Sequence, residues 1–331
     1  MQRLDYTLKD SLPTISIVIP TYNSPNLLAL CLENIRNQAY PQDKIEIIII
    51  DGGSKDKTLE IAKQYSVNKF CHNPLVVEEF GRALGIDSAS HDLIAFIDQD
   101  NLLASSDWIK KMVTPFQDSE IVGSEPLFYS YRHTDPSIVR YCGLIGGDDP
   151  FHVYLGYYDR FCYFTNKWTD TPIIQTDTPD YLKVRLLCSK KIPTMGANGF
   201  IVRKTNLHKI NYRPFIHTDI IFDLVNLGNS QFAKVKVGII HLHANSILEF
   251  MRKKIRRAQR YKPKLRKYND ISFKDPKLSL FVLRTILLLT AIDVAKGYRR
   301  KPDLAWLLHP LICLLALSTY ATKAIITMIH L

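Results

Sequence analysis

The sequence lacks the features that mark several common classes of protein. Its six cysteines are scattered through 331 residues with no C-x-x-C pair and no compact framework, which argues against a disulfide-stapled secreted domain. The polar N-terminus, from Met1 to Pro13, has no apolar core of the kind found in a secretory signal. No internal repeat or low-complexity tract is evident. We therefore expect a globular part that stays in the reducing cytoplasm and does not cross a membrane.

Positive charge is concentrated in one segment. The net charge is +11, and much of it comes from a cluster between positions 252 and 267. The cluster consists of Arg252, Lys253, Lys254, Arg256, Arg257, Arg260, Lys262, Lys264, Arg266 and Lys267. Such a run suits nucleic acid, anionic lipid or a diphosphate. Because no nucleic-acid-binding motif accompanies it and apolar segments follow it, we expect a membrane partner and no nucleic acid.

Two apolar segments, 278–294 and 304–329, close the chain. Arg284 and Asp293 interrupt the first segment, so it is either short and interfacial or a helix that pairs its charges. The second segment is long enough to span a bilayer, although it contains polar residues. Three arrangements stay open: re-entrant or spanning helices, which we favour, interfacial helices, or a soluble helical pair.

The first hundred residues alternate between strand and helix patterns. Three short runs are apolar on both faces, as strands inside a parallel sheet are, and segments with helical spacing follow or precede them. The strands are expected at 15–19, 45–50 and 93–97, and the helices at 27–38, 56–65 and 81–90. This repeat predicts an α/β fold with a doubly wound, mostly parallel sheet, in which ligands bind at the carboxyl ends of the strands.

The remainder of the chain is harder to interpret. Residues 126–192 are aromatic-rich and irregular, and they form either a loop-rich subdomain that packs its own rings or a ligand-binding cleft. Farther on, the pattern predicts a strand at 200–202, a helix that begins after Asp219, and a strand at 235–242.

Two carboxylates follow the third buried strand. Asp98 and Asp100 are separated by one residue, and in an extended segment side chains i and i+2 share a face. Such a pair suits a hard divalent cation, Mg or Mn. Asp-x-Asp triplets are common by chance on surface loops, but the position directly behind an apolar strand favours a functional role.

Three segments, in the right order, carry a resemblance to a known family. Ile17 to Asn23, Ile48 to Thr58 and Phe96 to Asp100 resemble the nucleotide loop, the second strand end and the metal motif of family 2 glycosyltransferases, which have the GT-A fold. The resemblance is close over 14–104 and looser over 194–261. It implies transfer of one sugar from a nucleotide-sugar donor, with a Mg or Mn ion and inversion at the anomeric carbon.

The resemblance also implies a nucleotide-sugar site. Its expected residues are Pro20, Thr21, Tyr22, Asp51, Arg82, Asp98 and Arg260. Asp51 would bind the nucleobase, and the alternative is a turn residue that caps the next helix. Arg82 would meet the diphosphate or ribose, and the alternative is a surface arginine. Tyr22 would line the base pocket or serve only in packing.

The same resemblance implies metal, acceptor and catalytic residues. The metal ligands would be Asp98, Asp100 and His241, with His243 as the other candidate of the histidine pair; a core histidine is the alternative. The acceptor loop would be Gly196, Ala197, Asn198 and Gly199, where glycines admit close backbone approach, although a plain turn is also possible. Asp219 is the candidate base, with Asp223 as the second choice. The segment around Arg260 departs from the Q-x-x-R-W element of processive members, which argues against a processive synthase.

These features predict that different parts of the chain have different functions. Residues 1–250 would form the GT-A domain, with a nucleotide-sugar half at 1–125 and an acceptor half at 126–250. Residues 251–331 would form a basic juxtamembrane segment and membrane-associated apolar helices. The predicted function is transfer to a lipid-linked or saccharide acceptor in glycan or polysaccharide assembly. The alternatives are a nucleotidyltransferase, which would need a Gly-rich basic loop in place of Pro20 to Asn23, and a catalytically silent membrane scaffold.

Overall fold

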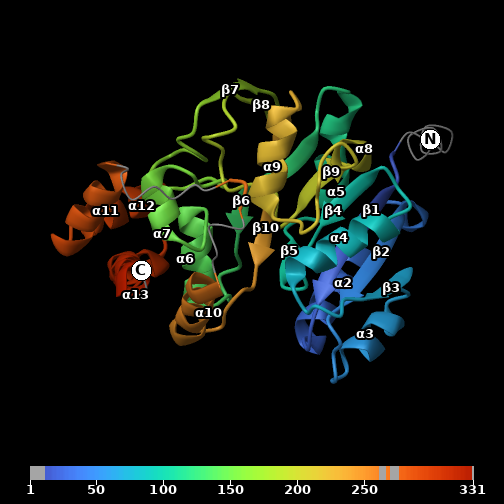
Figure 1. The fold of residues 1–331 in the computed structure, drawn as a ribbon, viewed down its shortest axis with the longest axis horizontal. Coiled ribbons are helices and arrows are strands. Elements are labelled where there is room, and N and C mark those ends of the chain that lie inside the picture. Colours follow the sequence, from blue (N-terminus) through green and yellow to red (C-terminus); the bar gives the residue numbers. More distant parts are fainter. Residues whose placement is uncertain (1–11, 261–265, 269–275, 330–331) are drawn as a thin grey trace. The chain divides into compact units, whose positions relative to one another are not determined.

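The structure is a computed structural model that describes residues 12–260, 266–268 and 276–329 (Figure 1). The chain divides into two compact units. The first comprises the described residues within 1–126, 173–189 and 195–240, and the second those within 127–172, 190–194 and 241–331. Each unit buries apolar side chains of its own.

A ten-stranded sheet has the order β3-β2-β1-β4-β9-β6-β10-β8-β7, with β5 paired to β10. The first four strands of this order are parallel. They are β1 (Ile15–Thr21), β2 (Ile45–Asp51), β3 (Lys69–His72) and β4 (Leu93–Phe96). The others are β5 (Asn101–Leu103), β6 (Gly123–Ser130), β7 (Ile173–Asp177), β8 (Tyr181–Leu186), β9 (Phe200–Arg203) and β10 (Gln231–His241). The predicted α/β class is confirmed, with antiparallel pairing of β9 to β4 and to β6, and of β8 to β10 and to β7.

The first unit also contains α-helices. They are α2 (Pro25–Arg36), α3 (Thr58–Gln64), α4 (Glu78–Ser88), α5 (Trp108–Val113), α8 (Lys204–Leu207) and α9 (His217–Asn226). Of these helices, α4 packs on the parallel strands β1, β2 and β3. A Cβ atom at Gly85 of α4 would lie 2.2 Å from Cγ1 of Val18 on β1, so only glycine permits this approach. The helix predicted to begin after Asp219 begins at His217, which places Asp219 inside its first turn.

The second unit is mainly helical. Its helices are α6 (Ser137–Ile145), α7 (Pro150–Leu155), α10 (Ile247–Arg260), α11 (Pro276–Ile286), α12 (Thr290–Arg300), the 3₁₀ helix η4 (Leu304–Leu308) and α13 (His309–Ile329). Trp306 and Ile312 join Tyr141 and Tyr158 in one apolar cluster, and Phe281 joins Phe151 in another. The C-terminal helices therefore contribute to the core of this unit.

The prediction that 126–192 is irregular holds only in part, because 156–172 lies outside the named helices and strands but other parts do not. The segment 126–192 contains α6, α7, β7, β8 and most of β6. Gly146 and Gly156 end the two helices in the left-handed conformation, and Asp149 caps the start of α7 by accepting a hydrogen bond from the N–H of Phe151. Buried rings such as Tyr141 and Tyr158 support the interpretation that the segment packs its own aromatics.

Among the described residues, one helical stretch, Leu304–Thr322, is long and apolar enough to cross a membrane. Helices α11 and α12 pass the same test only as a pair bent by 90°. The charges in this pair meet each other, because Nη2 of Arg284 lies 2.7 Å from Oδ2 of Asp293. The first apolar segment thus pairs its charges, but between two helices and not within a single one, and an interfacial position stays a prediction.

Candidate active site

The carboxyl ends of β1, β2 and β4 lie at one edge of the sheet. Thr21 pairs with Asp51 in the register of β1 and β2, and the N–H of Gly52 donates to the carbonyl of Thr21 at 2.9 Å. The hydroxyl of Thr21 also donates to Oε1 of Gln99 at 2.5 Å. Gln99 thus connects the loops that follow β1 and β4, a link that the sequence did not suggest.

The side chain of Asp51 accepts hydrogen bonds from the loop that follows β2. Its Oδ2 accepts hydrogen bonds from the N–H groups of Gly53 (2.8 Å) and Ser54 (2.9 Å), and its Oδ1 accepts from the Ser54 hydroxyl (2.6 Å). The turn role is therefore present, although the helix that follows begins only at Thr58. Tyr22 is 48% exposed, so its ring is not a core residue. Binding of a nucleobase by these residues stays a prediction.

The metal motif adopts a turn, not the extended conformation from which the shared face of its carboxylates was predicted. The N–H of Asn101 donates to the carbonyl of Asp98 at 2.9 Å, and Oδ1 of Asn101 accepts from the N–H of Asp98 at 3.1 Å. Asp98 and Asp100 nevertheless act on the same neighbour. Burial, together with the negative charges of Asp100 and Asp98, raises the pKa of the Cys31 thiol well above its usual range.

Arg82 of α4 holds Asp98. Its Nη2 lies 2.9 Å from Oδ1 and 3.0 Å from Oδ2 of Asp98, and it also bonds to Glu78. Burial disfavours the charged guanidinium, but the two carboxylates outweigh burial and raise the pKa of Arg82. Because Arg82 is only 5% exposed, the alternative of a surface arginine is wrong. Its contact with a diphosphate stays a prediction.

Glu78 is a site residue that the sequence reading missed. Arg82 lowers the pKa of the half-exposed Glu78, but partial desolvation and repulsion by Asp98, Glu79 and Asp100 outweigh that attraction and raise the pKa above its usual range. Glu78 and Arg82 are four residues apart on one helix, and this spacing was the available signal. The acidic side chains therefore form one mutually repelling group around a single guanidinium.

Asn101, also missed, links the metal motif to the predicted acceptor loop. Its side chain is buried, and Nδ2 donates to Oδ1 of Asp100 at 3.3 Å and to Oδ1 of Asn198 at 3.1 Å. A polar residue directly after the Asp-x-Asp triplet was the only sequence signal. The structure thus brings Asp100 and Asn198 together through one amide.

The predicted acceptor loop has an unusual backbone. Gly196, Asn198 and Gly199 have φ values of +108°, +48° and +89°. The N–H of Gly196 donates to Oε1 of Glu125 at 2.8 Å, and Oε2 of Glu125 accepts from Nζ of Lys234 at 2.7 Å. The side chains of Glu125 and Lys234 are fully buried, so the loop is anchored from the protein interior.

The loop lies against the start of α9, which carries the candidate base. A Cβ atom at Gly196 would be 3.0 Å from Cβ of His217, the first residue of α9. The N–H of Phe215 donates to the carbonyl of Glu79 at 2.9 Å, which ties this end of α9 to α4. Asp219 is 6% exposed and Asp223 is half-buried, and the assignment of the base stays a prediction.

The predicted histidine ligand lies in the second unit. His243 is buried, with Nε2 3.5 Å from Sγ of Cys142 and Nδ1 3.1 Å from the carbonyl of His241, so it is the core histidine of the pair. The ring of His241 stacks on Tyr129 with 6.1 Å between centroids. Among the residues that the structure describes, no three His, Cys, Asp or Glu side chains are grouped to hold a metal ion. His241 as a ligand stays a prediction.

The basic cluster is partly used inside the second unit. Lys254 of α10 lies 2.7 Å from Oδ2 of Asp149, and Arg257 pairs with Asp148. These cations hold the pKa of both aspartates below the usual range despite burial. Lys254 is thus mostly buried in protein, whereas the Arg257 side chain is 65% exposed and its contact with lipid stays a prediction. The side chain of Arg260 lies outside the described part of the chain.

Sequence comparison finds the predicted family within the first half of the chain. Residues 16–144 match the family described as Glycosyl transferase family 2. Glycosyltransferase AglE of Haloferax volcanii is 30% identical over 141 residues, which cover 40% of this chain and 46% of that protein. The dolichyl N-acetyl-alpha-D-glucosaminyl phosphate 3-beta-D-2,3-diacetamido-2,3-dideoxy-beta-D-glucuronosyltransferase of Methanococcus voltae is 52% identical over 50 residues, which cover 15% of this chain and 16% of that protein. The chain thus spans less than half the length of these relatives.

Structural comparison agrees on the fold. Mannosyltransferase PcManGT from Pyrobaculum calidifontis, solved with GDP-Man and Mn2+, aligns over 98% of this chain and 93% of its own, with a TM-score of 0.53 and 12% identity. At that identity the likeness shows the fold alone. The chain carries a family 2 glycosyltransferase domain on a GT-A fold. The family predicted from three motifs is confirmed.

Proposed function

We propose that this chain is a metal-dependent, inverting glycosyltransferase that moves one sugar from a nucleotide-sugar to an acceptor hydroxyl. One observation carries the proposal above all: Asn101 joins the carboxylate turn to the loop at 196–199. Donor-side and acceptor-side candidates are thereby placed at one edge of the sheet, where α/β folds bind their ligands. The family match supports the reaction class.

The donor set fits a hard divalent cation. Mg²⁺ is usually held by one or two carboxylates together with substrate phosphates, so the diphosphate would supply the remaining ligands. Asp100 would hold Mg or Mn, and Asp98 would lie beside the ribose and the ion while Arg82 fixes its orientation. When bound, the ion stabilises the charge that develops on the leaving diphosphate. His241 would complete the metal site.

The nucleotide would bind over the ends of β1 and β2. Pro20, Thr21, Tyr22 and Asp51 would line the base pocket, where the half-exposed ring of Tyr22 offers an apolar face. Arg82 and Arg260 would face the diphosphate, for which the guanidinium geometry is well suited. PcManGT, which shares the fold, was solved with a nucleotide-sugar and Mn2+, and this supports the choice of donor and ion.

The chemistry would be a single displacement. Asp219 would accept the proton of the acceptor hydroxyl, whose oxygen bonds to the anomeric carbon while the bond to the diphosphate breaks. Attack opposite the leaving group inverts the anomeric configuration. The loop at 196–199 would bind the acceptor, and its buried glycines, Gly196 and Gly199, would hold it in place by packing closely on His217 and Trp108.

The acceptor would be lipid-linked, or a saccharide presented at a membrane. The name of the relative from Methanococcus voltae includes dolichyl N-acetyl-alpha-D-glucosaminyl phosphate, and the C-terminal stretch of this chain is apolar. We assign donor binding to 1–125, acceptor binding to 126–250 and membrane association to 251–331. The catalytic domain would face the cytoplasm, in the service of glycan or polysaccharide assembly.

The test is release of nucleoside diphosphate by the purified chain. A panel of nucleotide-sugars is incubated with Mn or Mg and membrane lipid extract, beside Asp100→Asn and the control Asp177→Asn, whose carboxylate is exposed and pairs with Lys236. We expect turnover of one donor, a loss of about 10²–10³-fold in Asp100→Asn and no loss in the control. Full turnover by Asp100→Asn, or in excess chelator, would contradict the metal site. No turnover of any donor by the native chain would indicate a silent scaffold.

A further inference from the structure

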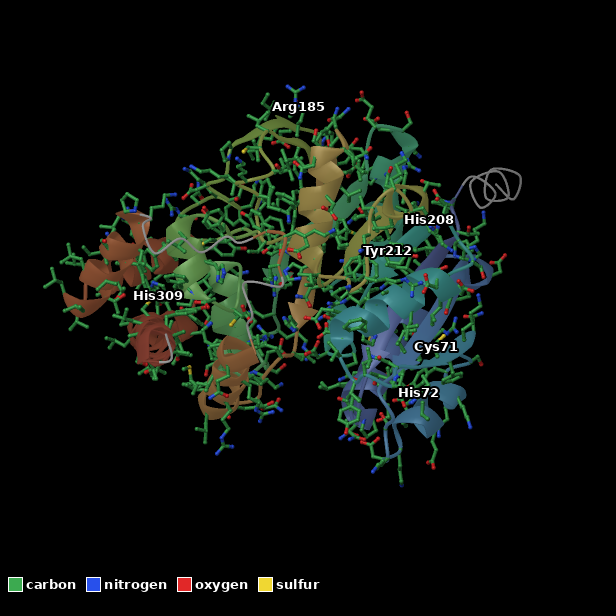
Figure 2. The ribbon with its side chains drawn as sticks, viewed as in Figure 1. Cys71, His72, Arg185, His208, Tyr212 and His309 are labelled. Carbon is green, nitrogen blue, oxygen red and sulfur yellow. The ribbon has the colours of Figure 1, made fainter. Side chains whose placement is uncertain are left out.

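The apolar stretch 304–320 is tied to polar groups along its whole length. Three polar side chains, one directly before its start, one in its middle and one at its end, bond to side chains of α6 and of the α7 N-cap within the second unit. The bonds join Asp303 to Arg140 (2.7 Å), Tyr141 to His309 (2.9 Å) and Tyr320 to Asp149. Figure 2 shows His309 among the helices of this unit. This face of the stretch is therefore committed to protein.

The opposite face of the same stretch is apolar and uncovered. Leu304, Leu307, Leu311 and Leu314 are 70%, 69%, 45% and 41% exposed. Their spacing of three, four and three residues places them on one side of a helix. Buried residues such as Ile312 lie on the other side. The stretch is thus amphipathic, although its composition alone passes as a membrane span.

The bent pair of α11 and α12 repeats this arrangement. Phe281 is buried in the core of the unit, while an outward surface of large apolar side chains is left exposed. That surface comprises Leu280, Leu283, Ile286, Leu287, Leu288 and Ile292. The charges of the pair turn inward, because Asp293 accepts from both Arg284 and the hydroxyl of Tyr154 at 2.6 Å. The charged groups of Arg284 and Asp293 therefore do not lie on the outward apolar surface.

We propose that these two leucine-rich surfaces enter one leaflet of an anionic bilayer and that residues 304–320 lie in the plane of the interface instead of crossing it. A spanning helix needs about 20 residues surrounded by apolar groups. Here Phe250 and Met251 of α10 share a core with Ile312, and α10 also carries exposed Arg252 and Arg256, which hydrocarbon does not accommodate. The second unit therefore sits on one side of the bilayer.

Charge complementarity identifies the occupant as lipid. Lys296 and Arg299 are exposed on α12, a few residues after Ile292, the last side chain of the exposed apolar surface. Arg252 and Arg256 are exposed on α10. Basic side chains beside an inserted apolar surface attract anionic headgroups. The inference deepens the membrane association in the proposed function, and it rests on that function only for the identity of the acceptor.

The first test is flotation of the full chain with vesicles of phosphatidylcholine, with and without phosphatidylglycerol. The variant Leu283→Glu/Leu307→Glu is compared with Leu187→Glu/Leu227→Glu, two leucines exposed in the first unit. We expect the first variant to lose partitioning by about tenfold per leucine and the control to match the native chain. Anionic lipid should strengthen native binding. A native chain that does not float, or equal losses in both variants, would overturn the proposal.

Two further readouts separate the rival outcomes. Sedimentation without vesicles detects self-association, and a dimer that Leu283→Glu/Leu307→Glu abolishes, with no flotation, would mean that a second copy covers the surface. Release of nucleoside diphosphate is measured on the same samples. A chain that floats without turnover refutes sugar transfer and leaves the membrane contact intact.

The second test distinguishes an in-plane from a spanning arrangement. Nitroxide labels are placed at Leu304→Cys and Leu314→Cys in a background with Cys71→Ser and Cys188→Ser, which removes the two partly exposed native thiols. An in-plane stretch gives equal depths for the two labels. A spanning stretch gives depths that differ by about 15 Å, from ten residues at 1.5 Å each, and this result would overturn the proposal.

Discussion

At the scale of single residues, a buried ion pair positions the predicted acceptor loop. Glu125 uses one carboxylate oxygen for the N–H of Gly196 and the other for Lys234. Buried pairs of this kind contribute little net stability compared with an apolar replacement, because desolvation offsets their attraction. Their value here is geometric: Glu125 fixes a backbone whose glycines adopt positive φ.

Lys234→Met is expected to destabilise the fold by about 3–5 kcal/mol, because it leaves the Glu125 carboxylate buried without a cation. The double variant Glu125→Gln/Lys234→Met should recover most of that loss, since the glutamine oxygen still accepts from Gly196 and no charge stays buried. Urea unfolding of the three proteins measures both effects. Equal stability of the single and double variants would show that the loss comes from packing and not from the unpaired charge.

At the scale of elements, the parallel half of the sheet depends on one close approach. Helix α4 carries Arg82 and Glu78 to the edge of the sheet only because Gly85 allows it to approach Val18 of β1. The packing role of this glycine could not be predicted from the sequence. Gly85, which determines how closely α4 packs on β1, therefore also affects the geometry around Asp98.

Gly85→Ala is expected to destabilise the fold by about 1–3 kcal/mol through overpacking, since its Cβ would lie 2.2 Å from Val18 Cγ1. The shift of α4 should also displace Arg82 from Asp98 and lower turnover. The double variant Gly85→Ala/Val18→Ala removes the obstructing methyl groups. Thermal unfolding and diphosphate release measure the two effects, and a double variant no better than the single one would rule out this contact as the cause.

The elements that the sequence predicted are those whose pattern is local. Runs such as Ile45–Asp51 are buried on both faces, so composition reveals both the strand and its polar end. The turn at 98–101 was missed because it depends on the side chain of Asn101 closing on Asp98. Helix α6 was missed inside an aromatic-rich segment, and its buried residues, such as Tyr141, share a core cluster with residues far along the chain, including Trp306. The conformation of such segments depends on residues far away in the sequence, and no local sequence pattern predicts it.

At the scale of the whole molecule, the apolar C-terminal segments serve two purposes at once. Hydropathy responds equally to a helix that faces lipid and to one that faces a protein core, so the sequence left three arrangements open. The structure shows a division within each helix: Phe281, Trp306 and Ile312 are buried, while leucines on the outward face are exposed. The second unit therefore depends on these segments for its core, and they are not a detachable anchor.

A chain that ends at residue 275 is expected to lose the fold of its second unit. It lacks Phe281, Trp306 and Ile312, and each large apolar side chain withdrawn from a core costs about 1.5–3 kcal/mol. Limited proteolysis with mass spectrometry should show rapid cleavage within 127–172, while the strands of the first unit stay protected. A chain that ends at Thr322 is the control, because it keeps the contacts of Tyr320. Equal protection of 127–172 in the two truncations would mean that α11 to α13 are a separable membrane anchor after all.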